Sequence, residues 1–372
     1  MKNKEEQTAP KLRFKGYTDA WQQRRIKNIA KLEDNKRIPV KASLRKKGSI
    51  PYFGANGIQD HVEGFTHTGE HVLIAEDGAN SITDYPVYYI SKPSWINNHA
   101  HVLTARPESD NLYLSYGLKN INYSQYLVGS GRYKLNSETL KTISLMIPSK
   151  KEQVKVAYLL SKLDDTITLL QRKKKKYENL KKALLQNLFP KNKKFIPDVR
   201  FKNFTDLWQP RRLGDIGSIS AGGDVDKQKL SSKPSYPVIA NALTNEGIIG
   251  YYQDYKIEAP AVTVTGRGSI GHAKARFVNF TPIVRLLVIK TAQNPIFLEN
   301  SINQTMIYNE STGVPQLTVP QLTKYKISIS SIPEQNKIGQ LLSKLDDTIT
   351  LLQKQINTLT SLKQFLLQNM FI

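Results

Sequence analysis

Apolar residues recur in two stretches of the chain at intervals that alternate between three and four positions. In the first stretch they are Val156, Leu160, Leu163, Ile167, Leu170, Tyr177, Leu184 and Leu188; in the second they are Ile338, Leu342, Leu345, Ile349, Leu352, Ile356, Leu359, Leu366 and Met370. This alternation is the a/d seam of a coiled coil, so each stretch is predicted to be a helix of some 38 residues, roughly 57 Å long. A lone seam would be exposed to water, and we expect the two helices to cover each other.

The two stretches carry one repeated sequence. Residues 159–171 and 341–353 both read LLSKLDDTITLLQ, and residues 184–189 (LLQNLF) correspond to residues 366–371 (LLQNMF). A second repeat relates residues 10–30 to residues 197–217, which share RFK, TD and WQ motifs and a pair of arginines. Residues 31–147 and 218–332 share little beyond short apolar runs and glycine-rich turns. The pattern therefore predicts one repeated scaffold, which we call the frame and which comprises the matched openings and helices. The unlike residues 31–147 and 218–332 are inserted into it, and we call them the inserts.

The connection between the repeats determines the direction of the second helix. The first helix is predicted over residues 149–190, bounded by Pro148 and Pro190, with a capping box formed by Ser149 and Glu152. Only a linker, residues 191–196, precedes the second repeat, so the second helix, residues 333–372, can cover the first only by running antiparallel to it. The expected fold is α+β, with two mixed α/β domains (residues 10–148 and 197–332), an antiparallel two-helix coiled coil between them, and a pseudo-two-fold internal repeat. Residues 1–9 are polar and are expected to be disordered.

Charged residues stand in and beside the predicted seam. Lys174, Lys181 and Lys363 occupy seam positions where an apolar residue is expected. The preferred interpretation is that these lysines snorkel to water, and the alternative is that they fix the register of the two helices. The carboxylate pairs 164–165 and 346–347 lie next to the seam, so a solvated or partner-facing role is favoured over catalysis.

The charge balance points to an anionic partner. The 372 residues carry a formal net charge of +23 and a pI of about 9.8. Nucleic acid is the leading candidate and an anionic membrane the alternative. No run of 18 apolar residues occurs, and the N-terminus has no hydrophobic region, so a soluble cytoplasmic protein is expected. The absence of cysteine excludes disulfides and thiolate metal sites.

Basic and amide side chains lie among glycines and aromatic residues in both inserts. Arg, Lys, Asn and Gln are the residue types that contact phosphates and base edges, and adjacent glycines allow a close approach. The candidate DNA-binding residues are Arg45, Lys46, Lys47, Asn56, Gln59, Arg132 and Lys134 in the first insert, and Asn241, Arg267, Ser269, Lys274 and Arg276 in the second. Ordinary solvated surface charge is the alternative for any one of them.

A basic run on the first predicted helix gives a further candidate contact. Residues Arg172, Lys173, Lys174, Lys175 and Lys176 are consecutive cations. They are expected to form a solvated helix face, and their functional interpretation is contact with DNA phosphates between two recognised sequences.

The chain shows few signs of catalysis or metal binding. It has no GxGxxG fingerprint and no GxxxxGK[ST] phosphate loop. The segment Asn294-Pro-Ile-Phe only approaches the Asn/Asp-Pro-Pro-Tyr/Phe loop of DNA amino-methyltransferases, and Asp254-Tyr-Lys is a short partial match to Mg²⁺ nucleases. The pairs His67/His71 and His99/His101 lack a matching ligand frame, so satisfied or surface histidines are favoured over a metal site. We predict no catalytic residue and no metal ligand.

The repeats resemble the specificity subunit of type I restriction–modification systems. The resemblance rests on the two LLSKLDDTITLLQ helices with their Glu-Gln starts and LLQN-Leu/Met-Phe ends, and on the RFK…TD…W openings, and it covers nearly the whole chain. It implies two target-recognition domains, each of which reads one half of a bipartite asymmetric DNA target. It also implies two methyltransferase (M) subunits that use S-adenosylmethionine to methylate adenine, and two restriction (R) subunits that use ATP and Mg²⁺.

The expected protein is therefore a non-catalytic DNA-binding subunit with no cofactor of its own. Two rival interpretations remain at the level of sequence. One is a self-sufficient nuclease built around Asp254, and the other is a coiled-coil adaptor without sequence preference.

Overall fold

The computed structural model describes residues 9–129, 132–191, 194–305 and 316–372. The chain divides into two compact units: unit 1 comprises Met1–Leu170 with Gln355–Ile372, and unit 2 comprises Gln171–Lys354. The expected disorder of residues 1–9 lies outside the described residues except for Ala9, and so do residues 192–193 of the predicted linker. Within the described ranges, no helix is long and apolar enough to cross a membrane.

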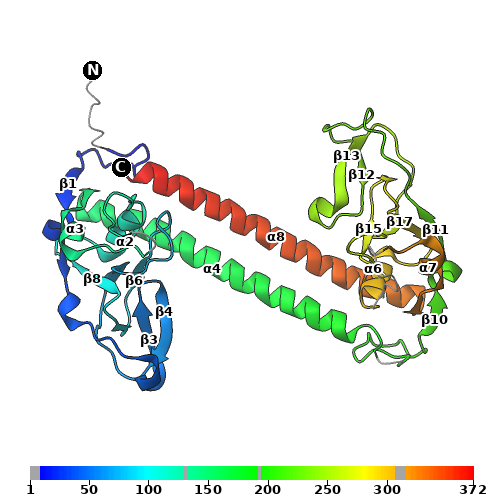
Figure 1. Ribbon diagram of the computed structural model, residues 1–372, viewed down its shortest axis with the longest axis horizontal. Helices are drawn as coiled ribbons and strands as arrows, with labels where there is room; N and C mark the ends of the chain where they lie inside the picture. The colour runs from blue at the N-terminus through cyan, green and yellow to red at the C-terminus, as the bar shows by residue number, and fades with distance from the viewer. Residues whose placement is uncertain (1–8, 130–131, 192–193, 306–315) are drawn as a thin grey trace. The chain divides into compact units, whose positions relative to one another are not determined.

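Unit 1 contains two principal sheets and short helices around the start of a long helix (Figure 1). Its elements are β1 (Gln22–Arg25), α1 (Ile26–Ile29), β2 (Ala30–Leu32), β3 (Lys47–Gly54), β4 (Gly57–Val62), β5 (His71–Ala75), β6 (Val87–Ile90), β7 (Trp95–Ile96), β8 (Ala100–Ala105), α2 (Asn111–Lys119), α3 (Ser137–Thr142), β9 (Ser144–Ile147) and the first part of α4 (Lys150–Asn187). One sheet has the order β2-β8-β5-β6 and the other β4-β3-β7, while β1 pairs with β9.

Unit 2 repeats this arrangement strand for strand. Its elements are β10 (Gln209–Arg212), α5 (Leu213–Ile216), β11 (Gly217–Ala221), β12 (Tyr236–Ile239), β13 (Ile248–Tyr252), β14 (Ala261–Val264), β15 (Ala273–Arg276), β16 (Thr281–Pro282), β17 (Leu287–Thr291), α6 (Pro295–Asn303), α7 (Val319–Lys324), β18 (Lys326–Ile329) and the first part of α8 (Ile332–Met370). The sheet orders β11-β17-β14-β15 and β13-β12-β16, with β10 beside β18, match those of unit 1. The predicted mixed α/β fold with an internal repeat is confirmed, and it extends to the inserts, whose sequences had shown little likeness.

Buried central strands explain why the inserts fold alike. Every residue of β5 (HVLIA) and of β14 (AVTV) is buried, and each strand has a neighbour on both sides. Continuous apolar or β-branched runs suit a strand that is covered on both faces. Val72 and Ile74 lie in the main core of unit 1, and Val262 and Val264 lie in that of unit 2.

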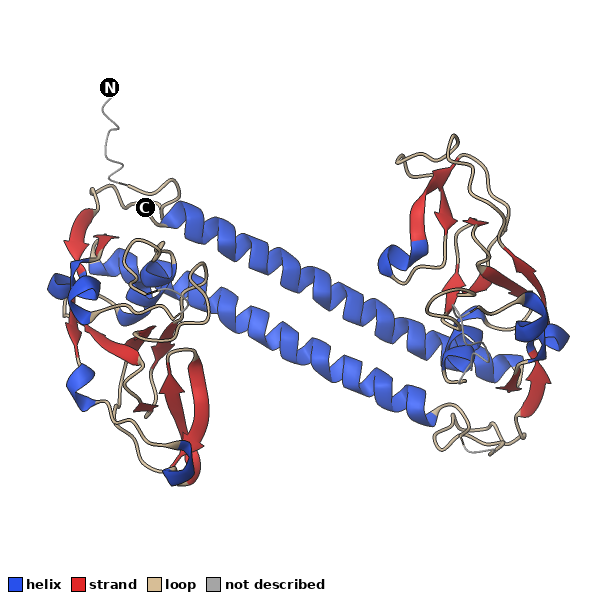
Figure 2. Cartoon of the chain, in the orientation of Figure 1, coloured by secondary structure: helices blue, strands red, loops and turns tan. Residues whose placement is uncertain are grey.

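The long helices α4 and α8 are each uninterrupted (Figure 2). All the seam residues named from the sequence are buried or half-buried, whereas Asp165, Thr166 and Leu169 between them are exposed. In unit 1 the start of α4 packs beside the end of α8, and in unit 2 the end of α4 packs beside the start of α8. The helices are therefore antiparallel, as the connectivity predicted.

Two interhelical ion pairs connect α4 with α8. The Nζ of Lys181 lies 2.5 Å from Oδ1 of Asp346, and the Nζ of Lys363 lies 2.5 Å from Oδ1 of Asp164. In both pairs the lysine is a seam residue and the acid is the first aspartate of the repeated LDD motif. This geometry supports register control by Lys181 and Lys363, whereas Lys174 pairs within its own helix with Glu178.

The start of each long helix is held by a buried carboxylate. Glu152 at the start of α4 accepts two bonds from Arg13, at 2.7 and 2.9 Å, and Glu334 at the start of α8 accepts the same two from Arg200. Each glutamate side chain is only 1% exposed. The carboxylate of Glu152 thus binds Arg13 rather than completing the expected capping box. The repeated RFK openings therefore hold the helix starts.

The end of each long helix inserts an aromatic ring into the other repeat's core. Phe371, after α8, stacks on Tyr113 of α2 with ring centroids 5.1 Å apart. Phe189, after α4, lies 5.5 Å from the ring of Phe297 on α6 and 6.1 Å from Trp208. The repeated LLQN-Leu/Met-Phe motif is therefore an anchor for the helix ends.

Helix α6 contacts β15 through a half-buried carboxyl group. Oε2 of Glu299 accepts the backbone N–H of Ala275 at 2.8 Å. Burial raises the pKa of Glu299 above its usual value, because the charged form loses its hydration. A carboxyl whose pKa is raised by folding destabilises the fold as the pH rises through that pKa.

We predict that reversing one charge of an interhelical pair weakens the fold and that reversing both restores it. Lys181→Glu places a carboxylate opposite Asp346, and adding Asp346→Lys recreates the pair in reverse. Because both side chains are partly solvated, a coupling energy of about 1 kcal/mol or less is expected in a double-mutant cycle. Urea unfolding of the four variants measures it, and strictly additive effects would count against register control by this pair.

We further predict that Glu299→Gln stabilises unit 2 at neutral pH but not in acid. Glutamine keeps an acceptor for the N–H of Ala275 without a partly desolvated charge, so the unfolding midpoint should rise above that of the wild type at about pH 7. At about pH 4, where the wild-type carboxyl is mostly protonated in both states, most of this difference in midpoint should be lost. Equal midpoints at both values would contradict the assignment.

Candidate nucleic-acid interface

The register of the four-stranded sheet in unit 2 brings three loops to one edge. Ala221 at the end of β11 pairs with Leu287 at the start of β17, and Leu287 also pairs with Val264 at the end of β14. The loop after β11, the loop before β17 and the loop after β14 therefore leave the sheet side by side. We call these loops, residues 222–223, 283–286 and 265–272, the unit 2 edge. Loops placed by a rigid sheet in this way commonly carry binding residues.

Asn241, which follows β12, joins two loops of the unit 2 edge. Its Nδ2 donates to the carbonyl oxygen of Val284, and its Oδ1 accepts the N–H of Gly266 at 2.7 Å. A Cβ at Gly266 would lie 2.8 Å from the carbonyl oxygen of Arg285, so glycine is needed for this approach. The side chain of Asn241, a predicted DNA-binding residue, is thus bonded to the backbone and shapes the edge.

Two residues in the loop before β17 have a left-handed backbone although neither is glycine. Val284 has a φ of 49° and Arg285 a φ of 59°, and such conformations cost about 1–3 kcal/mol each. Both side chains are exposed, as is that of Arg267 in the neighbouring loop. Within the described ranges neither arginine has an ion pair or a side-chain hydrogen bond. Among the described residues, the unit 2 edge therefore presents two guanidinium groups without a partner, and one of them, that of Arg285, stands on a strained backbone.

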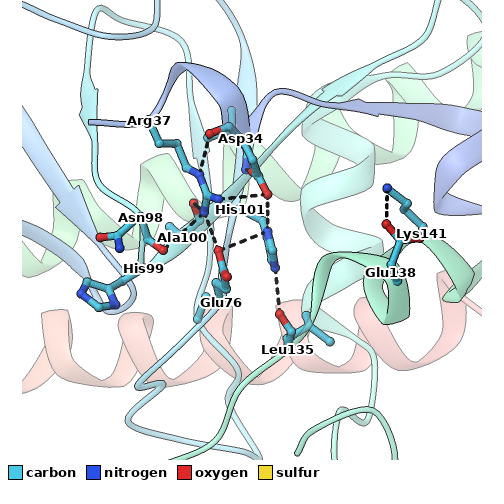
Figure 3. A network of polar contacts seen from close by, with 12 residues as sticks. Asp34, Arg37, Glu76, Asn98, His99, Ala100, His101, Leu135, Glu138 and Lys141 are labelled. Atoms are coloured by element: carbon cyan, nitrogen blue, oxygen red, sulfur yellow. Dashed lines mark hydrogen bonds and ion pairs between the residues drawn. The ribbon is translucent and has the colours of Figure 1, made fainter. Parts of the chain in front are cut away.

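The corresponding edge of unit 1 holds a network of ion pairs (Figure 3). Nη1 of Arg37 lies 2.6 Å from Oε2 of Glu76, and Nη2 lies 3.3 Å from Oδ2 of Asp34. The same oxygen of Asp34 is 2.6 Å from Nδ1 of His101. Lys134 adds a cation 3.7 Å from Oε1 of Glu76. Opposite charges therefore compensate each other at this edge.

Asp34, Glu76 and His101 lie close enough together to offer three ligands to a metal ion. However, the guanidinium of Arg37 already occupies the space between the two carboxylates, as Figure 3 shows. His101 is fully buried, and its Nε2 faces the carbonyl oxygen of Leu135 at 2.8 Å. A metal ion would have to displace Arg37, so the geometry favours an ion-pair network with a satisfied histidine.

Asp77 and Asn56 complete this edge of unit 1, the loops after β2, after β5 and before β8, which we call the unit 1 edge. Arg132 donates two bonds to Asp77, at 2.7 and 2.6 Å, and this bonding lowers the pKa of the Asp77 carboxyl. Asn56, at the turn between β3 and β4, donates to the carbonyl oxygen of Gly78 and accepts the N–H of Asn80. Asn56 thus supports a loop of unit 1 as Asn241 does in unit 2, and Arg132 is exposed but already paired.

The remaining candidates of unit 1 lie on the hairpin of β3 and β4 and before it. Arg45 is directed into the hairpin, with its guanidinium 4.1 Å from the centre of the Tyr52 ring and Nη1 3.4 Å from Asp60. Lys46 and Lys47 are exposed. Gln59 is also exposed and accepts a bond from Asn97 at 3.4 Å.

The remaining candidates of unit 2 lie on and before β15. Arg276 donates to Thr263 at 3.0 Å and to the carbonyl oxygen of Glu246 at 2.8 Å, and burial lowers the pKa of its guanidinium. Lys274 is exposed, 3.7 Å from a carboxylate oxygen of Glu246. Ser269 is exposed in the loop after β14, and its carbonyl oxygen accepts a bond from Thr265. Arg276 is therefore a packing residue, whereas Lys274 and Ser269 remain accessible.

The basic run on α4 is only partly free. Arg172, Lys173, Lys175 and Lys176 are exposed, whereas Lys174 is half-buried and pairs with Glu178 at 2.9 Å. The exposed members remain candidates for phosphate contact.

Two patterns that suggested catalysis have other positions in the fold. Asn294 is the N-cap of α6, where its Oδ1 accepts the N–H groups of Ile296 and Phe297. Asp254 is exposed between β13 and β14, and no second acid from the described residues joins it in a metal-ligand cluster. The first arrangement does not support a methyltransferase loop, and the second does not support the nuclease interpretation.

Sequence reasoning missed Arg285 and the pairing of Asp77 with His99. Arg285 has no glycine or basic neighbour, and nothing in the sequence indicates its left-handed backbone. His99 lies 3.7 Å from the Asp77 carboxylate, although 22 positions separate them in the chain. Both the backbone conformation of Arg285 and the contact of Asp77 with His99 depend on how the strands pair, and strand pairing cannot be inferred from a local sequence pattern.

Comparison with known proteins identifies the family. Residues 18–179 and 205–361 match the family model described as type I restriction modification DNA specificity domain. The chain is 28% identical over 355 residues to a protein of Haemophilus influenzae named as a candidate type I restriction enzyme specificity subunit, with 86% of each chain covered. It is 24% identical over 398 residues to a type I restriction enzyme specificity subunit of Methanocaldococcus jannaschii, with 93% of this chain and 91% of that one covered.

A solved structure shows the same fold. The crystal structure of the S subunit of a type I restriction-modification system from M. genitalium matches with a TM-score of 0.75 at 17% identity, over 98% of this chain and 99% of that one. Because the family model matches most of the chain in two segments, this protein belongs to the type I restriction modification DNA specificity domain family and carries two such domains.

Proposed function

We propose that the chain is a non-catalytic specificity subunit that directs a type I restriction–modification complex to DNA. Each domain reads one half of a bipartite asymmetric target. The observation that carries this function is that two domains of one fold present different side chains at the same edge. The unit 1 edge has an ion network around Glu76 and Asp77, whereas at the unit 2 edge Arg267 and Arg285 have no ion-pair partner among the described residues.

The division of labour follows from the contacts of each part. The repeated openings and long helices are tied together by buried pairs such as Arg13–Glu152 and Arg200–Glu334, so they serve as the frame. The edges and hairpins carry the exposed basic and amide groups. Phosphate contacts supply affinity, and base-edge contacts supply sequence preference.

In this proposal, partner subunits catalyse the reactions. The two repeats offer two equivalent surfaces to two copies of a methyltransferase (M) subunit, which holds S-adenosylmethionine and receives the flipped adenine. Two restriction (R) subunits hold ATP and Mg²⁺. This chain holds none of these groups, and it acts in the cytoplasm, where the DNA substrate lies.

Exchange of one insert tests the proposed function. Replacing residues 31–147 with the matching insert of another family member should change one half of the target and leave the other half and the spacing unchanged. Genome-wide mapping of methylated adenines in a host with the partner methyltransferase measures this. The matched control exchanges residues 218–332, which should change the opposite half.

Three outcomes would overturn the proposed function. An unchanged target after both exchanges would indicate that the inserts do not read DNA. Equal affinity of the wild type for all duplexes would favour an adaptor. Cleavage of DNA by the purified chain with Mg²⁺ alone would favour a nuclease.

The basic run gives an independent prediction. Changing Lys173, Lys175 and Lys176 to glutamine should weaken binding to every duplex alike, because phosphate contacts carry no sequence information. If each lysine neutralises one phosphate, the slope of log K against log salt should fall in magnitude by about 3. Titration of a labelled duplex over a salt series measures the slope, and an unchanged slope would rule out these contacts.

A further inference from the structure

Two positions correspond between the edges of the two units. Ile74 of β5 pairs with His101, and Val264 of β14 pairs with Leu287. Asp77 follows Ile74 by three residues, and Arg267 follows Val264 by three residues. Both are followed by a glycine with positive φ, 81° at Gly78 and 72° at Gly268. Asp77 in unit 1 and Arg267 in unit 2 therefore occupy the same place in one fold.

The same correspondence relates His99 to Arg285. Phe53 of β3 pairs in parallel with Ile96, and Ile239 of β12 pairs in parallel with Pro282. His99 follows Ile96 by three residues, and Arg285 follows Pro282 by three residues. Because His99 lies 3.7 Å from Asp77, the equivalent positions of Arg267 and Arg285 are neighbours as well.

The two units compensate charge at these positions differently. In unit 1 Asp77 is paired with Arg132, and His99 lies 3.7 Å from the same carboxylate, so the acid at this position is neutralised within the protein. In unit 2 both positions carry arginine, and neither guanidinium has an acidic partner within the described ranges. Neighbouring like charges repel, so this arrangement suits a ligand that supplies acceptor groups.

The backbone of the unit 2 edge favours a ligand that approaches closely. Arg267 stands between Gly266 and Gly268, and a Cβ on Gly268 would meet no atom within 4 Å. The strained turn at Val284 and Arg285 is fixed by the bond from Asn241. Strain of this kind persists where the surroundings determine the conformation, and it concentrates at functional sites.

We propose that Arg267 reads a guanine in the half-site of unit 2 and that Arg285 holds the adjoining phosphate. The two acceptors of guanine in the major groove, O6 and N7, match the paired donors of one guanidinium. A phosphate next to that base matches the second guanidinium. This assignment rests on the proposed function, since it specifies which residue of the reading domain determines one base pair.

The test uses the full chain with its partner methyltransferase and the target mapped for the wild type. Duplexes carry each of the four base pairs at every position of the unit 2 half-site, and their methylation rates and affinities are compared. Arg267→Ala should abolish the preference for guanine at one position, a loss of discrimination of roughly 5- to 150-fold. Arg285→Ala should weaken binding to all duplexes and lower the salt slope by about 1.

Control variants distinguish a loss of base recognition from a loss of folding or of positive charge. Lys326→Ala removes the same charge from an exposed site on β18 and should leave every preference intact. Thermal unfolding of Arg267→Ala should match that of the wild type, and recognition of the unit 1 half-site should persist.

Each remaining outcome overturns the assignment. If Arg267→Ala weakens all duplexes equally, the residue is a phosphate contact. If the preference at every position survives, other groups read this half-site. In both cases the wild type still recognises two half-sites, so the proposed function survives. If the wild type shows no sequence preference at all, the proposed function itself fails.

Discussion

The burial of an apolar seam by its own repeat is the constraint on which the rest of this structure depends. Each unit contains the first part of one long helix and the last part of the other, so each core is completed by a helix end that returns from elsewhere in the chain. Met370 and Phe371 belong to the core of unit 1, and Leu188 and Phe189 belong to a core of unit 2. A slip of one turn between the helices would part Lys181 from Asp346 and Lys363 from Asp164 and misplace both aromatic ends. Register, charge pairing and domain packing therefore depend on the same alignment.

The frame and the edges are stabilised by separate interactions, and this separation allows the edges to differ. The frame uses bidentate pairs such as Arg200–Glu334, which both units share. Behind the edges, the bonds of Asn56 and Asn241 to the described residues go to backbone groups, so they support the loops without restricting the side chains that the loops carry. Opposite charges can consequently occupy the position of Asp77 and Arg267 without a change in strand order.

The sequence predicts the helices well because a seam of 4 and 3 spacing is a property of neighbours in the chain. It cannot predict that Lys181 meets Asp346, since that contact depends on how two helices align. The same limit applies to the site. Arg45, Arg276 and Asn241 stand in loop-like or glycine-rich sequence, yet they bind Tyr52, Thr263 and Val284 of their own domains. Whether a guanidinium faces DNA or its own protein is decided by strand pairing, which single-sequence patterns do not encode.

The unlike edges constrain the kind of target that one chain can recognise. A surface that offers two guanidinium groups selects base edges rich in acceptors, whereas an edge in which Asp77 and Arg132 compensate each other offers both acceptors and donors. In the proposed function, two domains with such different hydrogen-bonding character at the same edge prefer different half-sites. A symmetric frame is therefore compatible with an asymmetric target: the repeated helices and openings determine how the domains are built, and the proposal assigns target binding to the edges, which differ.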